Sequence, residues 1–179
     1  ENKEVQGVKT VERFRKKFED DAAAFMPIDK VTRGETHTIL FNIDVQSSGQ
    51  KDETAVLRVF AKMFYHYLGF YGEDLKVAKL EQFIEKQGKT AEFRRVFEEK
   101  NGASWLSSRD SFAFFEDDVV STLTQVLGMS ESAAENWFNG TQTEDISIAK
   151  LVSEIKEYLA AKPQDFRLLF MIDEVGQYV

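Results

Sequence analysis

Near its C-terminal end the chain contains the run Leu168-Leu169-Phe170-Met171-Ile172-Asp173-Glu174. Five apolar residues are followed directly by two carboxylates, and a short continuous apolar run of this kind is typical of a strand buried on both faces of a parallel sheet. A similar run lies between His37 and Asp44 and has Ile39, Leu40 and Phe41 at its centre. The two runs predict short parallel strands at about residues 37–44 and 166–173.

The residues between the two strands have helical periodicity. Apolar positions repeat at helical spacing from Val56 to Leu68, and glycines such as Gly102 follow apolar-periodic stretches where helices should end. We therefore predict an α/β fold that is predominantly helical, with a helix and the first strand in residues 1–45. Residues 46–162 form a helical insertion and residues 163–179 carry the second strand.

A helix is also predicted from Thr10 to about Asp20, and Pro27 and Gly34 indicate an irregular connection after it. If the two strands pair in parallel, the helical insertion is their crossover connection, which is almost always right-handed. Two strands do not make a stable sheet by themselves. We therefore expect the chain to be part of a larger sheet.

The composition and charge of the chain indicate which classes of protein it can belong to. The chain of 179 residues is 42% hydrophobic and 30% charged, contains no cysteine and has a net charge of −8. An acidic surface disfavours direct contact with DNA. The first residues, Glu1-Asn2-Lys3-Glu4, do not form a signal peptide, and no apolar run reaches the roughly 20 residues of a membrane span. These features predict a cytoplasmic protein without disulfide bonds.

The Asp-Glu end of the second strand has the form of a Walker B motif. In this motif a buried strand delivers the aspartate, here Asp173, to Mg²⁺ beside the nucleotide phosphates, usually through water. The following glutamate, here Glu174, orients and polarises the attacking water. The same pattern also occurs at ordinary strand-to-helix turns. Asp44 ends the first strand at the same edge of the sheet, where it either joins the site or caps a loop.

A phosphate-binding loop is absent from the sequence. The nearest match is Gly88-Lys89-Thr90, but Phe83 occupies the position of the first glycine, and the tripeptide lies between two helical patterns. We interpret it as the end of one helix and the start of the next. The only histidines, His37 and His66, have no partners at metal-ligand spacing. The aromatic residues Trp105, Trp137, Phe112, Phe114 and Phe115 are expected in the core, with a partner surface as the alternative.

Three segments together resemble the large P-loop ATPase subunit of BREX, the bacteriophage-exclusion defence systems of bacteria and archaea. They are residues 39–44 (Ile-Leu-Phe-Asn-Ile-Asp), residues 128–138 (from Gly-Met-Ser-Glu to Trp-Phe) and residues 170–178 (Phe-Met-Ile-Asp-Glu-Val-Gly-Gln-Tyr). The stretch Glu1-Asn2-Lys3-Glu4-Val5 is similar to the region after that family's Walker A helix. The resemblance covers essentially the whole chain, and Asp173 to Gln177 is its most specific part.

The resemblance implies an AAA+-like sheet with ATP and Mg²⁺ as cofactors, Asp173 at the metal and Glu174 at the water. It also implies other BREX subunits as partners, and self-association of the parent protein. The phosphate-binding loop, sensor residues and arginine finger are not among these residues, so we expect an internal part of an ATPase domain that is inactive alone. Two alternatives remain: a mainly helical protein-interaction module without nucleotide chemistry, and an AAA+ or STAND-type ATPase outside BREX.

Overall fold

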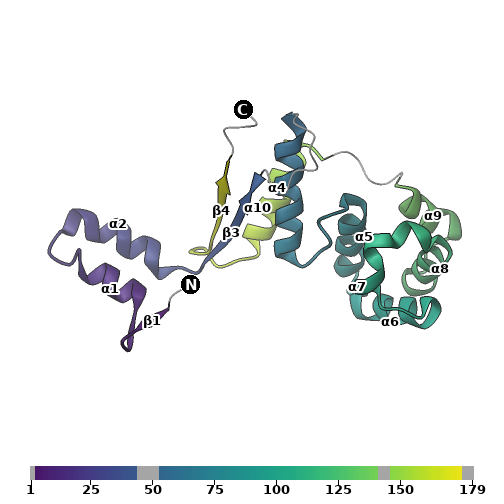
Figure 1. The fold of residues 1–179 in the computed structure, drawn as a ribbon, viewed down its shortest axis with the longest axis horizontal. Coiled ribbons are helices and arrows are strands. Elements are labelled where there is room, and N and C mark those ends of the chain that lie inside the picture. The colour runs from purple at the N-terminus through teal and green to yellow at the C-terminus, as the bar shows by residue number, and fades with distance from the viewer. Residues whose placement is uncertain (1–2, 44–52, 141–145, 175–179) are drawn as a thin grey trace. The chain divides into compact units, whose positions relative to one another are not determined.

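In the computed structural model, the described residues are 3–43, 53–140 and 146–174, and Figure 1 shows their helices and strands. The chain forms two compact units. The first contains residues 1–40 and 152–171, and the second contains residues 41–151 and 172–179. Helices make up 65% of the residues that the structure describes, which confirms the predominantly helical class.

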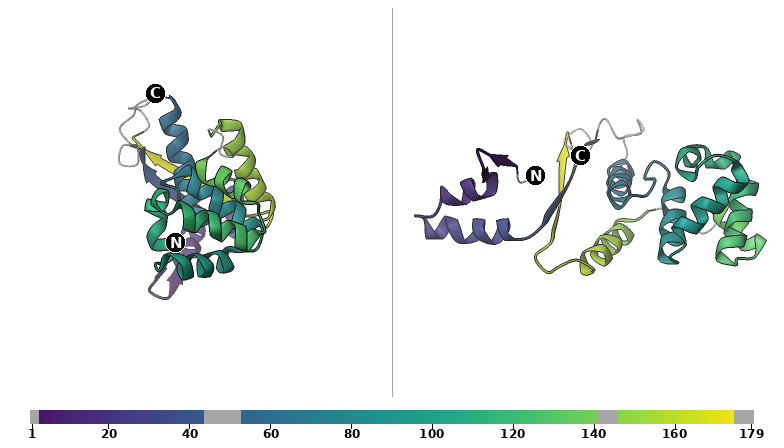
Figure 2. Two further views of the ribbon diagram at one scale, coloured as in Figure 1. Left: turned by 90° about the vertical axis from the view of Figure 1, so that its right-hand side faces the viewer. Right: turned by 90° about the horizontal axis from the view of Figure 1, so that it is seen from below.

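The first unit begins with a small hairpin that the sequence did not predict. Strands β1 (Glu4–Val5) and β2 (Val8–Lys9) pair antiparallel, with Glu4 opposite Lys9. Helices α1 (Thr10–Lys16) and α2 (Ala22–Arg33) follow. They lie side by side (Figures 1 and 2), joined by the buried Asp29 of α2, which pairs with Arg15 of α1 and Arg33 of α2.

The predicted irregular connection at Pro27 is wrong, because the chain forms helix α2 there. Pro27 lies inside α2, although proline removes one helical hydrogen bond. The Asp21 side chain caps the helix by accepting hydrogen bonds from the backbone N–H groups of Ala23 and Ala24. This cap and the alanine-rich first turn favour the helix enough to outweigh the lost bond.

Strands β3 (Thr36–Asn42) and β4 (Arg167–Asp173) form the predicted parallel pair. The Arg167 N–H donates to the Glu35 carbonyl at 2.9 Å. In a parallel ladder this bond places Arg167 beside Thr36, and the same register continues to Asp173 beside Asn42. The carboxyl ends of both strands therefore lie together.

Burial of these strands on both faces was predicted and is wrong for the described residues. Ile39 and Phe41 are buried, and Phe41 packs edge-on against Phe60 of α4 (Glu53–Leu68) with ring centroids 5.4 Å apart. On the opposite face Leu40 is 69% exposed and Met171 is 53% exposed. Among the residues that the structure describes, the face of the pair that bears Leu40 and Met171 is therefore largely exposed.

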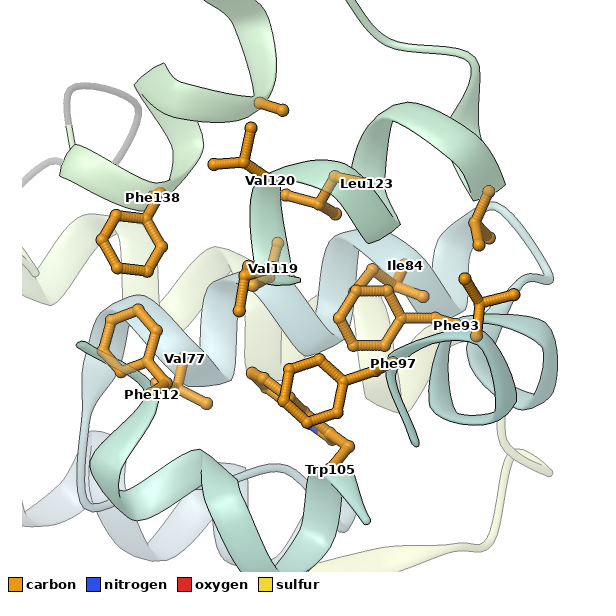
Figure 3. Packing of buried hydrophobic residues seen from close by; sticks show 14 residues of the cluster. Val77, Ile84, Phe93, Phe97, Trp105, Phe112, Val119, Val120, Leu123 and Phe138 are labelled. Atoms are coloured by element: carbon orange, nitrogen blue, oxygen red, sulfur yellow. The ribbon is translucent and has the colours of Figure 1, made fainter. Parts of the chain in front are cut away.

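The helices of the second unit that follow α4 share one core, and we call them the helical block (residues 75–139). They are α5 (Leu75–Lys86), α6 (Thr90–Asn101), α7 (Trp105–Ser108), the 3₁₀ helix η1 (Arg109–Phe114), α8 (Glu116–Leu127) and α9 (Glu131–Asn139). Figure 3 shows the interlocking side chains of this core, among them Ile84, Phe97, Leu123 and Phe138. Helix α10 (Ile148–Ala160) then leads toward β4.

The predicted core aromatics are mostly confirmed. Trp105 is 1% exposed and meets Phe93 and Phe97 edge-on, with ring centroids 5.2 and 5.1 Å apart. Phe112 is buried, and Trp137 stacks on Phe83 at 4.8 Å. The partly buried Phe115 packs against the same core. Phe114 is the exception, because its side chain is 86% exposed.

A buried carboxylate joins four parts of the second unit. Glu81 of α5 is 7% exposed and accepts hydrogen bonds from the Trp105 indole N–H at 2.7 Å, an Arg109 Nη1 at 2.9 Å and the Tyr71 backbone N–H at 2.6 Å. A buried charge is tolerated when it is paired and its lone pairs are satisfied. Glu81 meets this condition and fixes α5, α7, η1 and the loop before α5 to one another.

The corner between α4 and α5 is held by a second polar contact. A Cβ atom at Gly72 would lie 2.2 Å from the Lys62 carbonyl oxygen, so only glycine permits this approach of the loop to α4. The neighbouring Glu73 carboxylate forms an ion pair with Lys62 Nζ at 2.7 Å and contacts His66 Nε2 at 3.2 Å. Burial alone would raise the pKa of Glu73, but the hydrogen bonds from Lys62 and His66 outweigh it and lower that pKa.

Glu81→Gln is expected to lower the free energy of unfolding of the helical block by about 3 kcal/mol, because the amide leaves a buried donor unpaired. Urea unfolding followed by tryptophan fluorescence reports on this block, which contains both tryptophans of the chain, Trp105 and Trp137. Glu85→Gln, at an exposed position of the same helix, is the matched control and should change stability by less than about 0.5 kcal/mol. Equal stability of the two variants would contradict this role of Glu81.

Glu73→Gln should destabilise the chain near neutral pH. The folded-state pKa of Glu73 is below its ordinary value of 4.5, so its contribution to stability is present above that value and is lost as the pH falls through the folded-state pKa. Thermal unfolding from about pH 7 to about pH 3 should show the two proteins converging at the acidic end. A pH-independent difference, or one that Glu98→Gln reproduces at an exposed site of α6, would count against the contact.

Candidate functional site

The predicted site residues lie at the carboxyl end of the strand pair. Asp173 is the last residue of β4, Glu174 follows it, and Asn42 is the last residue of β3. The Asn42 Nδ2 group donates a hydrogen bond to Glu174 Oε2 at 2.8 Å. The strand register and this side-chain bond therefore bring together residues that are 132 positions apart in the chain.

Glu174 directly follows β4 and has an unusual backbone conformation. Its φ angle is 62°, in the left-handed region that residues other than glycine rarely adopt. This conformation costs on the order of 1–2 kcal/mol. The Glu174 N–H donates to Asp173 Oδ1 at 2.9 Å, which partly offsets that cost and holds the Asp173 carboxylate against the backbone of Glu174.

Asp173 and Glu174 are exposed, and Asn42 is half-buried. Carboxylate oxygens at the accessible end of a strand suit Mg²⁺, which usually binds through one or two carboxylates, several waters and substrate phosphates. A cage built from protein side chains is not found: the described residues contain no group of three or more His, Cys, Asp or Glu side chains that could hold a metal ion.

The tripeptide Gly88-Lys89-Thr90 lies at the junction of two helices, as predicted. Gly88 has a φ angle of 68° immediately after α5, and Thr90 is the first residue of α6. The Lys89 ammonium pairs with Glu92 at 2.7 Å. The tripeptide thus ends one helix and starts the next, as the sequence analysis concluded.

The other candidate residues are not brought to this site within the described chain. His37 contacts Glu35 at 2.7 Å, and His66 contacts Glu73. Asp44, and the residues that follow Glu174, lie outside the described residues. Sequence reasoning missed Asn42, and the only signal for it was its place as a polar residue between the apolar Phe41 and Ile43 at the end of a predicted strand.

None of the described helices has the length and apolar character needed to cross a membrane. A comparison with models of known protein families found no match, and no solved structure matched the chain.

Proposed function

We propose that this chain is an internal part of the ATP-hydrolysing domain of an AAA+-like P-loop ATPase, from a bacterial anti-phage defence system of the BREX type. In this proposal it contributes the Walker B strand β4 and the helical insertion, and it is inactive by itself. The observation that carries the proposal is the end of β4. There Asp173 and Glu174 are accessible beside a parallel neighbouring strand whose last residue, Asn42, binds the glutamate.

Each carboxylate has a separate role in this proposal. Asp173 would hold Mg²⁺, which when bound would supply positive charge beside the phosphates. Glu174 accepts a proton from the water that attacks the terminal phosphate, which is general base catalysis. In open α/β sheets ligands bind outside the carboxyl ends of the strands, which is where both side chains lie.

The phosphates also need a glycine-rich loop that these residues do not contain, so the proposal places that loop upstream in a longer protein. ATP and Mg²⁺ are then cofactors of the parent protein and bind this chain weakly. The proposed partners are other BREX subunits and further copies of the parent protein. The net charge of −8 disfavours direct contact of this segment with DNA.

One observation favours a second function, a helical protein-interaction module. The helical block has its own core, yet Phe114 is 86% exposed and Leu106 is 51% exposed on its surface. Exposed large apolar side chains of this kind occur at protein interfaces. In this case Asp173 and Glu174 only end a strand, and the chain takes no part in nucleotide chemistry.

Glu174→Gln, in a protein extended upstream to include the phosphate-binding loop, should reduce ATP turnover by at least about 100-fold. Binding of Mg·ATP should persist, because the amide keeps the shape of the side chain but cannot accept the proton. A steady-state phosphate-release assay measures the first effect, and calorimetry with Mg·ATP measures the second. Glu135→Gln, at an exposed position of α9, is the matched control. Normal turnover in Glu174→Gln would contradict the assignment of Glu174 as the general base.

A further inference from the structure

A small cavity lies beside the buried Glu81 carboxylate in the second unit. Its volume is about 30 Å³, and a cavity needs only about 10–15 Å³ to hold one water molecule. Three of the side chains that line it, labelled in Figure 3, are apolar or aromatic and at most 2% exposed: Ile84, Phe93 and Trp105. Glu81 and Thr90 add polar groups to the wall. A wholly apolar cavity stays dry, whereas a cavity with polar groups in its wall suits water.

The Thr90 hydroxyl is a buried polar group that needs a partner. Thr90 is the first residue of α6, and its Oγ1 atom is buried without a hydrogen-bond partner among the described residues. The ammonium of the preceding Lys89 is paired with Glu92 at 2.7 Å. Buried hydroxyl groups are nearly always hydrogen-bonded, to protein or to ordered water, because an unmade bond costs free energy. The position of Thr90 in the cavity wall therefore points to a partner inside the cavity.

Glu81 has one position left to accept a hydrogen bond. The two oxygens of a carboxylate offer about four lone-pair positions. Oε1 accepts bonds from the Trp105 indole and from Arg109 Nη1, whereas within the described part of the chain Oε2 accepts one bond, from the Tyr71 backbone N–H. A water molecule that accepts the Thr90 O–H and donates to Oε2 satisfies both groups at once.

We propose that this cavity is a binding site for one water molecule, which bridges the Thr90 hydroxyl and the Glu81 carboxylate. The three direct partners of Glu81 named above come from α7, η1 and the loop before α5. The water adds the first turn of α6 to this network, so that one buried carboxylate connects four helices of the helical block. This site is independent of the proposed nucleotide chemistry.

The stability of Thr90→Val tests the site by the sign of its effect. Valine replaces the hydroxyl with a methyl group of similar size. It therefore leaves a bridging water without one partner, and the thermal midpoint of unfolding should fall by roughly 2–4 °C. If the hydroxyl is merely unpaired, valine removes a buried unsatisfied group, and the midpoint should rise. A raised or unchanged midpoint would overturn the proposal.

Two further variants control for the substitution itself. Thr90→Ser keeps the hydroxyl, so its midpoint should lie closer to that of wild type than the midpoint of Thr90→Val. Thr124→Val makes the same change at a half-buried position of α8, where the hydroxyl donates to the Val120 carbonyl at 3.0 Å. It should lower the midpoint less than Thr90→Val does. A larger loss in either variant than in Thr90→Val would contradict the bridge.

A crystal structure of the 179-residue chain tests the site directly. A water oxygen within about 3.2 Å of both Thr90 Oγ1 and Glu81 Oε2 is expected in wild type, and its loss is expected in Thr90→Val. A cavity without electron density for water, in wild-type crystals that show ordered waters elsewhere on the helical block, would overturn the proposal whatever the stability of the variants.

Discussion

Parallel pairing of β3 with β4 is the constraint on which the candidate site depends. Parallel neighbours cannot be joined by a hairpin and need a long crossover connection, which here runs from the end of β3 to the start of β4. The pairing also places the carboxyl ends of both strands together, so that Asn42 reaches Glu174. An antiparallel pair with the same sequences would place Asn42 near the start of β4 and would leave no contact of this kind.

The connection between the strands is more than a linker, because most of it folds around its own core. The helical block buries Trp105, Phe97 and Leu123 in one cluster, and its one buried acid, Glu81, is satisfied within the same unit by Trp105, Arg109 and the Tyr71 backbone. A block with its own core can be inserted in the sequence between two strands of a sheet without contributing side chains to the packing of those strands. This agrees with the proposal that it is an insertion in an ATPase domain.

The sequence predicts helices and strands well where the pattern is local. Apolar periodicity located helices such as α4, but it did not locate the short helices α7 and η1 that follow Gly102. Gly102 and Gly128 end α6 and α8 in the left-handed conformation expected of such glycines. The helix through Pro27 was missed because the Asp21 cap and alanine-rich first turn outweighed the proline. The prediction that both faces of the strands are buried was wrong, since Leu40 and Met171 are exposed on one side. A continuous apolar run shows that a strand could be buried on both faces, but it does not show which elements cover them. Asp173 and Glu174 are predicted as site residues from the motif alone. The contact of Asn42 with Glu174 depends on the register between strands far apart in the chain, which no local pattern contains.

The decisive measurement is calorimetric binding of Mg·ATP to two proteins: the 179-residue chain and a version extended upstream to include a glycine-rich phosphate-binding loop. Binding by the extended protein alone is the result that the proposed function predicts, because in that proposal the phosphates are bound by the glycine-rich loop, and Asp173 and Glu174 form only another part of the site. An absence of binding in both proteins would contradict the ATPase proposal and favour the helical interaction module. Tight binding of Mg·ATP by the shorter chain would contradict the proposal that its nucleotide site is incomplete without the upstream loop.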